Sequence, residues 1–167
     1  MKKIIFLFSI VVLFSSCLDL RFAQSMPASA TALSEFPESL RGTYVSKNNK
    51  DTMHVSNDSI DAANIRLGED NVLKPFGKYY VLNSKKNDRW NVAIIEPCGK
   101  RVLKLYAFDI ADGKKRKALN TISPLVEVYD DEGSVDYVSA NPTDAEFEKM
   151  LKCKGLVEID RFRRIKE

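Results

Sequence analysis

The chain has 167 residues, with 26 Lys and Arg against 23 Asp and Glu, one His and three Cys. Hydrophobic residues make up 44% of it, too many for a disordered chain, and 7 Gly and 6 Pro without a period exclude collagen-like sequence. Lys2 and Lys3 contribute two charges to the net charge of +3. Because the remaining charges nearly balance, we expect no nucleic-acid partner. This length and composition predict one globular domain with an appendage.

Residues 1–16 have the pattern of a secretory signal peptide. A basic segment from Met1 to Lys3 precedes an apolar run over 4–14, in which Ser9 is the only polar residue. A run this short cannot cross the hydrocarbon core of a bilayer, which needs about 20 apolar residues. We therefore expect residues 1–16 to be removed.

A lipid-attachment motif follows the apolar run. The chain reads Leu13-Phe14-Ser15-Ser16-Cys17, so that two small residues precede a cysteine. This resembles the lipobox of bacterial lipoproteins, although Phe14 departs from the usual Leu. The resemblance implies cleavage before Cys17, attachment of a diacylglycerol to its thiol and acylation of its new amino group. Two or more acyl chains anchor a protein stably to a membrane that it does not span.

The residue after Cys17 bears on the location of the protein. In some Gram-negative lineages an Asp at that place retains a lipoprotein in the inner membrane, and here the residue is Leu18. The resemblance therefore implies attachment to the outer membrane, facing the periplasm. The alternatives are an unmodified Cys17, or simple secretion after cleavage at Ala28-Ser29-Ala30, which lies far beyond the apolar run.

Small and polar residues predominate from Cys17 to Ser34, without sustained strand or helix periodicity. This composition predicts a flexible tether over 17–34, with a root-mean-square reach of about 20 to 25 Å. A single β-rich domain is then expected over 35–167.

Short alternating apolar segments dominate that domain, and each is rich in Val, Ile, Tyr and Thr, as β-strands are. Turn residues such as Asn57-Asp58 and Pro97-Cys98-Gly99 separate the segments. Connectors this short join antiparallel neighbours, which predicts a meander. The expected strands cover 40–46, 51–56, 59–67, 76–83, 89–95, 101–109, 124–129 and 134–139.

Two of these segments, 89–95 and 101–109, carry apolar residues on both faces. This pattern is typical of strands at the centre of a sheet that is covered on both sides. In the first segment the two apolar sets are Trp90, Val92 and Ile94 on one parity, and Ala93 and Ile95 on the other.

A helix is expected to cover one of these faces. Thr143 and Glu146 have the spacing of a capping box, and Gly155 marks the end of the helix. The stripe that would face the core consists of Phe147, Met150 and Leu151. Residues 156–165 follow as a last strand with a bulge, with a second short helix as the alternative.

The segment Leu40-Arg41-Gly42-Thr43-Tyr44 resembles the Gly-x-Trp element of lipocalin-like (calycin) β-barrels, with Tyr44 in the place of Trp. The expected fold class is mainly β: an antiparallel meander, either a lipocalin-like barrel or a curled open sheet, with one C-terminal helix. The chain also resembles small envelope lipoproteins of unknown function, a class that implies no activity.

Cys98 and Cys153 remain after lipidation of Cys17, as an even pair in an oxidising compartment. A disulfide between them would join the turn before segment 101–109 to the end of the helix. The alternative is two separate buried thiols.

Motifs for catalysis are missing from the sequence. It has no Gly-x-Ser-x-Gly, no phosphate-binding glycine-rich loop and no His-Glu-x-x-His. His54 is the only histidine, and its parity, opposite Met53 and Val55, predicts that it faces solvent or a neighbouring strand. We expect no enzymatic activity, no cofactor and no metal site.

Two functions are compatible with this pattern. The first is a monomeric binding module that holds a small apolar ligand, with Tyr44, Tyr79, Trp90 and Tyr106 as candidate lining residues. The alternative is a protein-interaction module, an inhibitory or accessory subunit of the envelope, that uses a sheet face or edge. The basic run Lys114–Lys117 is expected in a loop, either solvated or in contact with anionic lipid headgroups.

Overall fold

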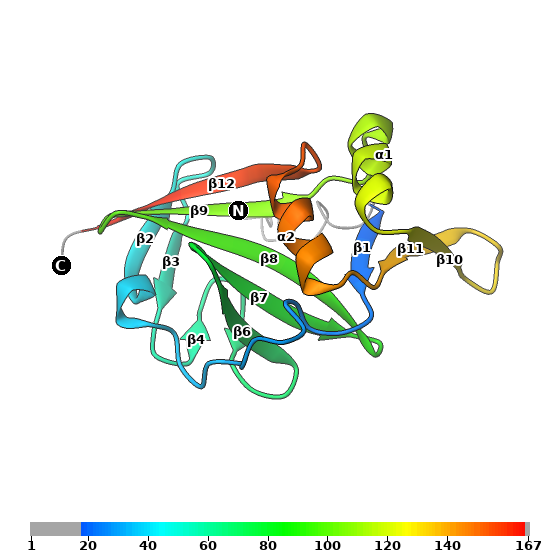
Figure 1. Cartoon of the computed structure of the whole chain (residues 1–167). Helices are drawn as coiled ribbons and strands as arrows, with labels where there is room; N and C mark the ends of the chain where they lie inside the picture. Colours follow the sequence, from blue (N-terminus) through cyan, green and yellow to red (C-terminus); the bar gives the residue numbers. More distant parts are fainter. Residues whose placement is uncertain (1–17, 166–167) are drawn as a thin grey trace, which may run out of the picture.

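The structure is a computed structural model that describes residues 18–165. Within that range, twelve strands form one mixed, mostly antiparallel open sheet, and two α-helices pack on it (Figure 1). Of the described residues, 47% lie in strands and 15% in helices, with a short 3-10 helix included. The expected mainly β fold is confirmed in its open-sheet form. The expected signal peptide over 1–16 and the expected lipid acceptor Cys17 lie outside the described residues.

The element bounds follow most of the expected segments. Two stretches are exceptions. A turn in which Asn64 adopts a φ of 50° divides 59–67 into two short strands. The expected strand 76–83 crosses a turn at Gly77, so the strand there runs from residue 79 to 86, and residues 71–76 form a further strand that was not expected. The elements are β1 (Asp19–Phe22), η2 (Glu38–Leu40), β2 (Gly42–Ser46), β3 (Thr52–Val55), β4 (Ser59–Ile60), β5 (Ile65–Arg66), β6 (Asn71–Phe76), β7 (Tyr79–Lys86), β8 (Arg89–Cys98), β9 (Val102–Phe108), α1 (Gly113–Ile122), β10 (Leu125–Tyr129), β11 (Val135–Ala140), α2 (Asp144–Lys152) and β12 (Leu156–Arg164).

The sheet is a meander that two strands interrupt. Its order is β10-β11-β1-β8-β9-β12-β2-β3-β4-β5, in which β1 and β9 pair with different parts of the same edge of β8. The opposite edge of β8 pairs with β7, and β7 pairs in turn with β6. Successive strands pair as antiparallel neighbours from β2 through β5, and again from β6 through β9. The strand β12 inserts between β9 and β2, and β1 inserts between β11 and β8. The pair β1 and β11 is parallel, which makes the sheet mixed.

The central strand β8 separates two hydrophobic clusters, as its sequence predicts. Its even-numbered residues face the outer cluster and its odd-numbered residues face the inner cluster. We define the outer cluster as Leu20, Phe22, Met26, Val81, Ile94, Ile110, Leu119, Val138, Ala140, Phe147, Met150 and Leu151. We define the inner cluster as Phe36, Leu40, Tyr44, Val55, Ile60, Leu73, Leu82, Ile95 and Leu103.

Helix α2 covers the outer cluster, as expected (Figure 1). The capping box is present, because the Thr143 hydroxyl accepts from the Glu146 N–H while the Glu146 carboxylate accepts from the Thr143 N–H. The stripe of Phe147, Met150 and Leu151 is buried. The helix ends before the expected Gly155, since Lys152 is its last residue and Cys153 its C-cap. Gly155 is instead required by packing, because a Cβ there would lie 2.5 Å from the Leu119 side chain of α1.

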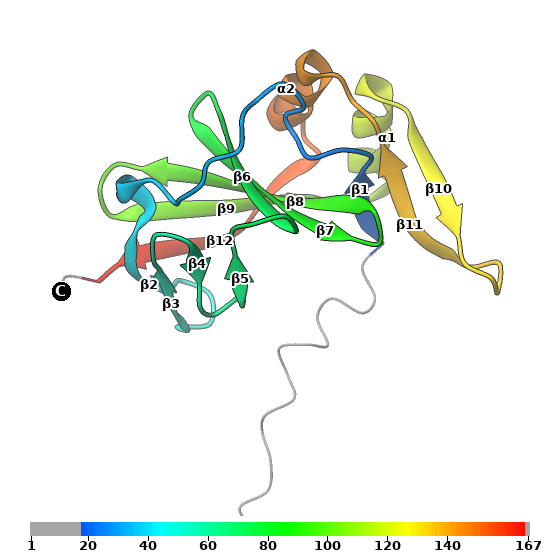
Figure 2. The same cartoon turned by 90° about the horizontal axis from the view of Figure 1, so that it is seen from below.

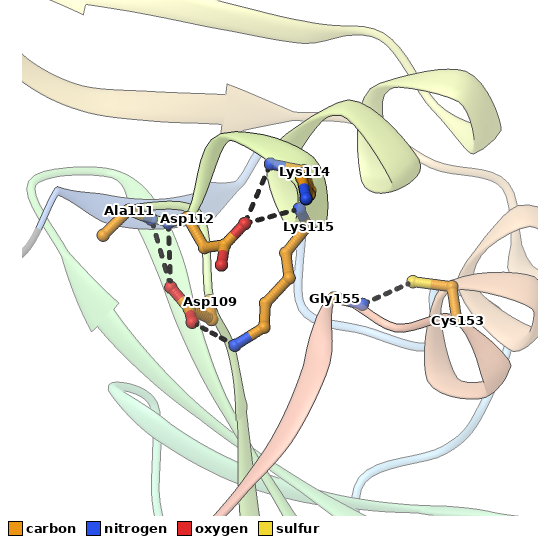
Figure 3. Close-up of polar contacts among 7 residues, drawn as sticks. All are labelled: Asp109, Ala111, Asp112, Lys114, Lys115, Cys153 and Gly155. Atoms are coloured by element: carbon orange, nitrogen blue, oxygen red, sulfur yellow. Dashed lines mark hydrogen bonds and ion pairs between the residues drawn. The ribbon is translucent and has the colours of Figure 1, made fainter.

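The basic run Lys114–Lys117 belongs to helix α1 rather than to a loop. Asp112 is its N-cap and accepts hydrogen bonds from the backbone N–H groups of Lys114 and Lys115 (Figure 3). Asp112 was an N-cap signal in the sequence, but the basic run after it was interpreted as a loop. The described chain has two α-helices, whereas one was expected. Lys115 also forms an ion pair with Asp109 at 2.7 Å, which anchors the start of the helix.

The expectation of a flexible tether over 17–34 is wrong for its described part. Strand β1 lies inside the sheet, and Leu20 and Phe22 belong to the outer cluster. The alternation of Leu18, Leu20 and Phe22 is the sequence signal for this strand, and its shortness concealed it. The described domain therefore begins with Leu18 instead of residue 35.

The segment that follows β1 runs past helix α2 and along the sheet (Figure 2). Three side chains hold it there. We call residues 23–31 the strap. Buried Asn83 bonds both the N–H and the C=O of Met26, and Lys74 Nζ donates to the Ser25 and Pro27 carbonyls at 3.1 and 3.0 Å. The carboxylate of Asp144 accepts from the backbone N–H groups of Ala28 and Ser29.

The last strand, β12, is continuous apart from a register shift between Glu158 and Asp160. The expected strand with a bulge is confirmed, and the alternative of a second short helix at this place is wrong.

Candidate functional site

The four aromatic residues expected to line one ligand cavity do not meet. Tyr44 is 1% exposed and belongs to the inner cluster. Tyr79, Trp90 and Tyr106 pack against the outer cluster, on the opposite face of the sheet. A single cavity lined by all four is therefore excluded by the alternation of side chains along the strands.

Tyr44 links strand β2 to the last described strand, β12. Its hydroxyl donates to the Leu40 carbonyl at 3.0 Å and accepts from Arg164 Nη2 at 2.7 Å. Gly42 adopts a φ of +133°, and a Cβ there would lie 3.1 Å from Arg164 Nε. The segment Leu40–Tyr44 thus serves to join β2 to β12 at one end of the inner cluster.

Tyr106 takes part in a polar chain on the outer face. Its hydroxyl donates to Glu96 at 2.6 Å, and Glu96 also accepts from Lys78 at 2.6 Å. Burial, reinforced by the hydrogen bond to Glu96, raises the pKa of Tyr106. Burial acts to raise the pKa of Glu96, but the hydrogen bonds from Lys78 and Tyr106 outweigh it and lower that pKa. Glu96 is therefore a stable carboxylate at neutral pH and not a proton donor.

Cys98 and Cys153 are free thiols, and the expected disulfide between them is not formed. Cys98 lies opposite Val102 at one end of β9, whereas Leu156, close after Cys153, lies opposite Phe108 at the other end. The length of β9 separates these pairs by about 20 Å, far beyond the Cα separation that a disulfide bridges. Cys153 Sγ instead accepts from the Gly155 N–H at 3.2 Å (Figure 3).

An apolar pocket of about 130 Å³ lies within the inner cluster. One wall comes from the inner face of β7, β8, β9 and β12, and the other from β3 to β5 and the chain before β2; Figure 2 shows these two groups of strands. We call this the inner pocket. Its lining residues are Phe36, Leu40, Met53, Val55, Ile60, Ala63, Ile65, Leu82, Ala93, Ile95, Leu103, Lys104, Leu105 and Phe162.

The inner pocket offers hydrocarbon contacts and little else. Lys104 is its only ionisable lining residue, and every other side chain is apolar. Met53, Ile65 and Phe162 are half-buried, so the pocket approaches the surface at these side chains. A site of this kind selects apolar molecules by shape, because it has few polar groups to orient a ligand.

The sequence contained part of the signal for the inner pocket. Ala93 and Ile95 were identified as a second apolar face of β8, and that face lines the pocket. The alternation over 59–67 predicted one strand and gave no sign of the turn at Asn64. The lining residues on β4 and β5 were therefore not identified from the sequence. Whether a face is packed or hollow depends on distances between strands that are far apart in the sequence.

Arg21 is a buried cation that the sequence analysis did not identify. It is 3% exposed on β1, its guanidinium lies 4.1 Å from the centroid of the Tyr137 ring, and Asp19 and Asp136 lie 3.6 and 3.7 Å from Nη2. Among described residues, Nε and Nη1 have no hydrogen-bond partner. The Tyr137 ring stacks on the guanidinium, which gives Arg21 a packing role.

The described part of the chain has few features of other kinds of site. Between residues 18 and 165, no three His, Cys, Asp or Glu side chains are grouped so that they could hold a metal ion. His54 is exposed, and its Nδ1 lies 3.1 Å from the Thr43 hydroxyl. In the same range, no helix has the length and apolar character needed to span a membrane.

Comparisons of the chain with protein-family models, with curated proteins and with solved structures found no match.

Proposed function

We propose that this chain is a lipid-anchored, non-enzymatic protein of the bacterial cell envelope that binds a small apolar molecule in the inner pocket. The pocket is the observation that carries the binding proposal. It is an apolar cavity within a sheet whose other face is filled by aromatic side chains. The sequence of residues 1–17 supports the anchor, at the outer membrane and facing the periplasm.

The size and lining of the inner pocket limit the class of ligand. A cavity of about 150 Å³ in another protein admits benzene, and the inner pocket, at about 130 Å³, is comparable. A small ring or the end of a hydrocarbon chain fits this volume. Charged and strongly polar molecules do not fit, because they would lose hydration without gaining hydrogen bonds.

Titration with benzene, followed by methyl NMR of the mature chain, tests the binding site. We expect shifts for the methyl groups of Leu82, Ile65 and Leu105, and none for Leu119 in the outer cluster. The variant Ala93→Leu, which fills the pocket, should lower benzene affinity at least tenfold. The matched variant Ala145→Leu, at an exposed position of α2, should bind as the wild type does. Unchanged pocket methyl signals at saturating benzene would contradict the proposal.

The anchor is tested separately by labelling cells with radioactive palmitate. We expect Cys17→Ala to abolish labelling and to release the protein from the membrane fraction. The matched variant Cys98→Ala removes a thiol from the domain and should leave both properties unchanged. Persistent membrane attachment of Cys17→Ala would show that something other than the lipid holds the protein.

The edge of the sheet supports the second candidate function, a protein-interaction module. Strand β10 ends the strand order, and it exposes Val126 and Tyr129 to 59% and 58%. Exposed apolar residues on an edge strand are suited to pairing with an added strand. Crosslinking in intact envelopes distinguishes this role, since a partner should be captured by the wild type and lost in Val126→Asp.

A further inference from the structure

A second apolar depression lies outside the inner pocket, where two strands separate from β8. One edge of β8 pairs with β1 at Trp90 and with β9 from Ile94 onward, so β1 and β9 diverge between these points. A groove of about 560 Å³ occupies this region. We call it the lateral groove, and its lining residues are Leu18, Asp19, Leu20, Lys86, Asn91, Val92, Ala107, Phe108, Asp109, Ile110, Ala111, Val157 and Ile159.

The lateral groove is apolar along most of its length and polar at a few points. Nine of its thirteen lining residues are Leu, Val, Ile, Phe or Ala, and the others are Asp19, Lys86, Asn91 and Asp109. It shares no lining residue with the inner pocket. Ile159 is 45% exposed, so part of this apolar surface faces solvent. An exposed apolar groove with polar residues beside it is the usual form of a binding surface for hydrocarbon.

The proposed lipid anchor would place a hydrocarbon beside this groove. Leu18 lines it, and Cys17 is the residue directly before Leu18 in the sequence, one peptide unit away. Strand β1 and the strap fix the chain from Asp19 onward, so a lipid on Cys17 would be attached within one residue of the groove lining. A group linked covalently at such a short distance is present at high effective concentration.

From these observations we infer that an acyl chain of the lipid on Cys17 docks in the lateral groove. This inference rests on the proposed lipid anchor. An acyl chain matches the groove better than a protein segment does, because the lining offers extended apolar contact and few hydrogen-bonding groups. The remaining acyl chains of the same lipid stay free to insert into the bilayer.

Photo-crosslinking in intact cells tests the inference with the full chain. Cells are supplied with palmitate that carries a diazirine and an alkyne, irradiated, and the purified protein is digested for mass spectrometry. We expect label on Cys17 and carbene insertion into peptides that contain Ala107 and Phe108 or Val157 and Ile159. The variant Ile159→Asp should keep its label and lose these crosslinks at least fivefold. The matched variant Val126→Asp, at another exposed strand position, should retain them.

The outcomes separate the groove from the anchor. A wild-type chain without label would overturn the lipid anchor, and the docking inference with it. Labelled protein whose crosslinks lead only to membrane lipid or to other proteins would overturn the docking inference and leave the anchor intact. Equal crosslinking in wild type and Ile159→Asp would also overturn it.

Discussion

The two faces of the central strands β7, β8 and β9 differ in how completely they are filled. On the outer face, Phe147 contacts the rings of Phe22, Phe76 and Phe108 at centroid distances of 5.8 to 6.1 Å. On the inner face, the strands β3 to β5 curve over a cavity lined mostly by aliphatic side chains, with Phe36 and Phe162. One set of strands thus supports a packed core on one side and a hollow on the other.

The difference arises from what covers each face. A helix presents a continuous stripe of side chains, and α2 places Phe147, Met150 and Leu151 directly into the outer cluster. The inner face is covered by the short strands β4 and β5, each of two residues, which bring fewer large side chains. We expect stability to depend most on the outer cluster and ligand binding on the inner one.

The largest effect is expected from Phe147→Ala, which removes the ring at the centre of the outer cluster. Because the site is fully buried, the free energy of unfolding should fall by about 3 to 5 kcal/mol. Phe162→Ala, a half-buried position on the inner pocket, should cost less than half as much. Urea denaturation of both variants measures this, and equal losses would contradict the contrast between the faces.

A smaller effect should come from adding volume to each face in turn. Ala140 is 2% exposed in the outer cluster, so Ala140→Val should destabilise the fold by about 1 to 3 kcal/mol. Ala93 borders the inner pocket, where an added methyl group has room, and Ala93→Val should change stability by less than about 0.5 kcal/mol. Thermal denaturation of the pair measures the difference. A larger loss for Ala93→Val would show that the inner face is not hollow.

A small, pH-dependent effect is expected at the rim of the outer cluster, where Asp144 holds the strap. Burial acts to raise the pKa of Asp144, but hydrogen bonds from Ser29 and Ala28 outweigh it and hold the pKa below its ordinary value of 3.8. The stabilisation is therefore complete above that value and is lost as pH falls through the lower folded-state pKa. Asp144→Asn should cost about 1 kcal/mol at pH 7 and reduce the acid sensitivity of unfolding below pH 4.

Denaturation of both proteins between pH 7 and pH 2 checks this prediction. The free energies of unfolding should converge as Asp144 becomes protonated in the wild type. A difference that stays constant across this range would assign the effect to something other than the carboxylate.

Most strands of this fold could be predicted from the sequence, because the alternation of apolar and polar residues is a local pattern. The two apolar faces of β8, the stripe of α2 and the bulge of β12 all follow from neighbouring residues. The position of β1 was not readable, since four residues of alternation do not reveal a partner such as β11 at the other end of the chain.

The candidate site was harder to predict than the fold. Aromatic residues suggested a lining because they are large, yet Tyr44 and Tyr106 are engaged by Arg164 and Glu96. The cavity instead lies beside Ala93 and Leu105, and the apolar face to which Ala93 belongs did not reveal whether it was packed or hollow. Likewise, the even count of cysteines could not reveal that β9 keeps Cys98 and Cys153 apart.

The place of β1 has a consequence for the order in which the sheet can form. It is the first strand of the described chain, and its parallel partner β11 is among the last. In the strand order, β1 alone joins the β10–β11 hairpin to β8. Pairing between segments so distant in sequence requires the closure of a long loop, which slows folding. The pairing that attaches the hairpin to the rest of the sheet therefore requires residues from both ends of the described chain, and it is not possible before residues 135–140 are present.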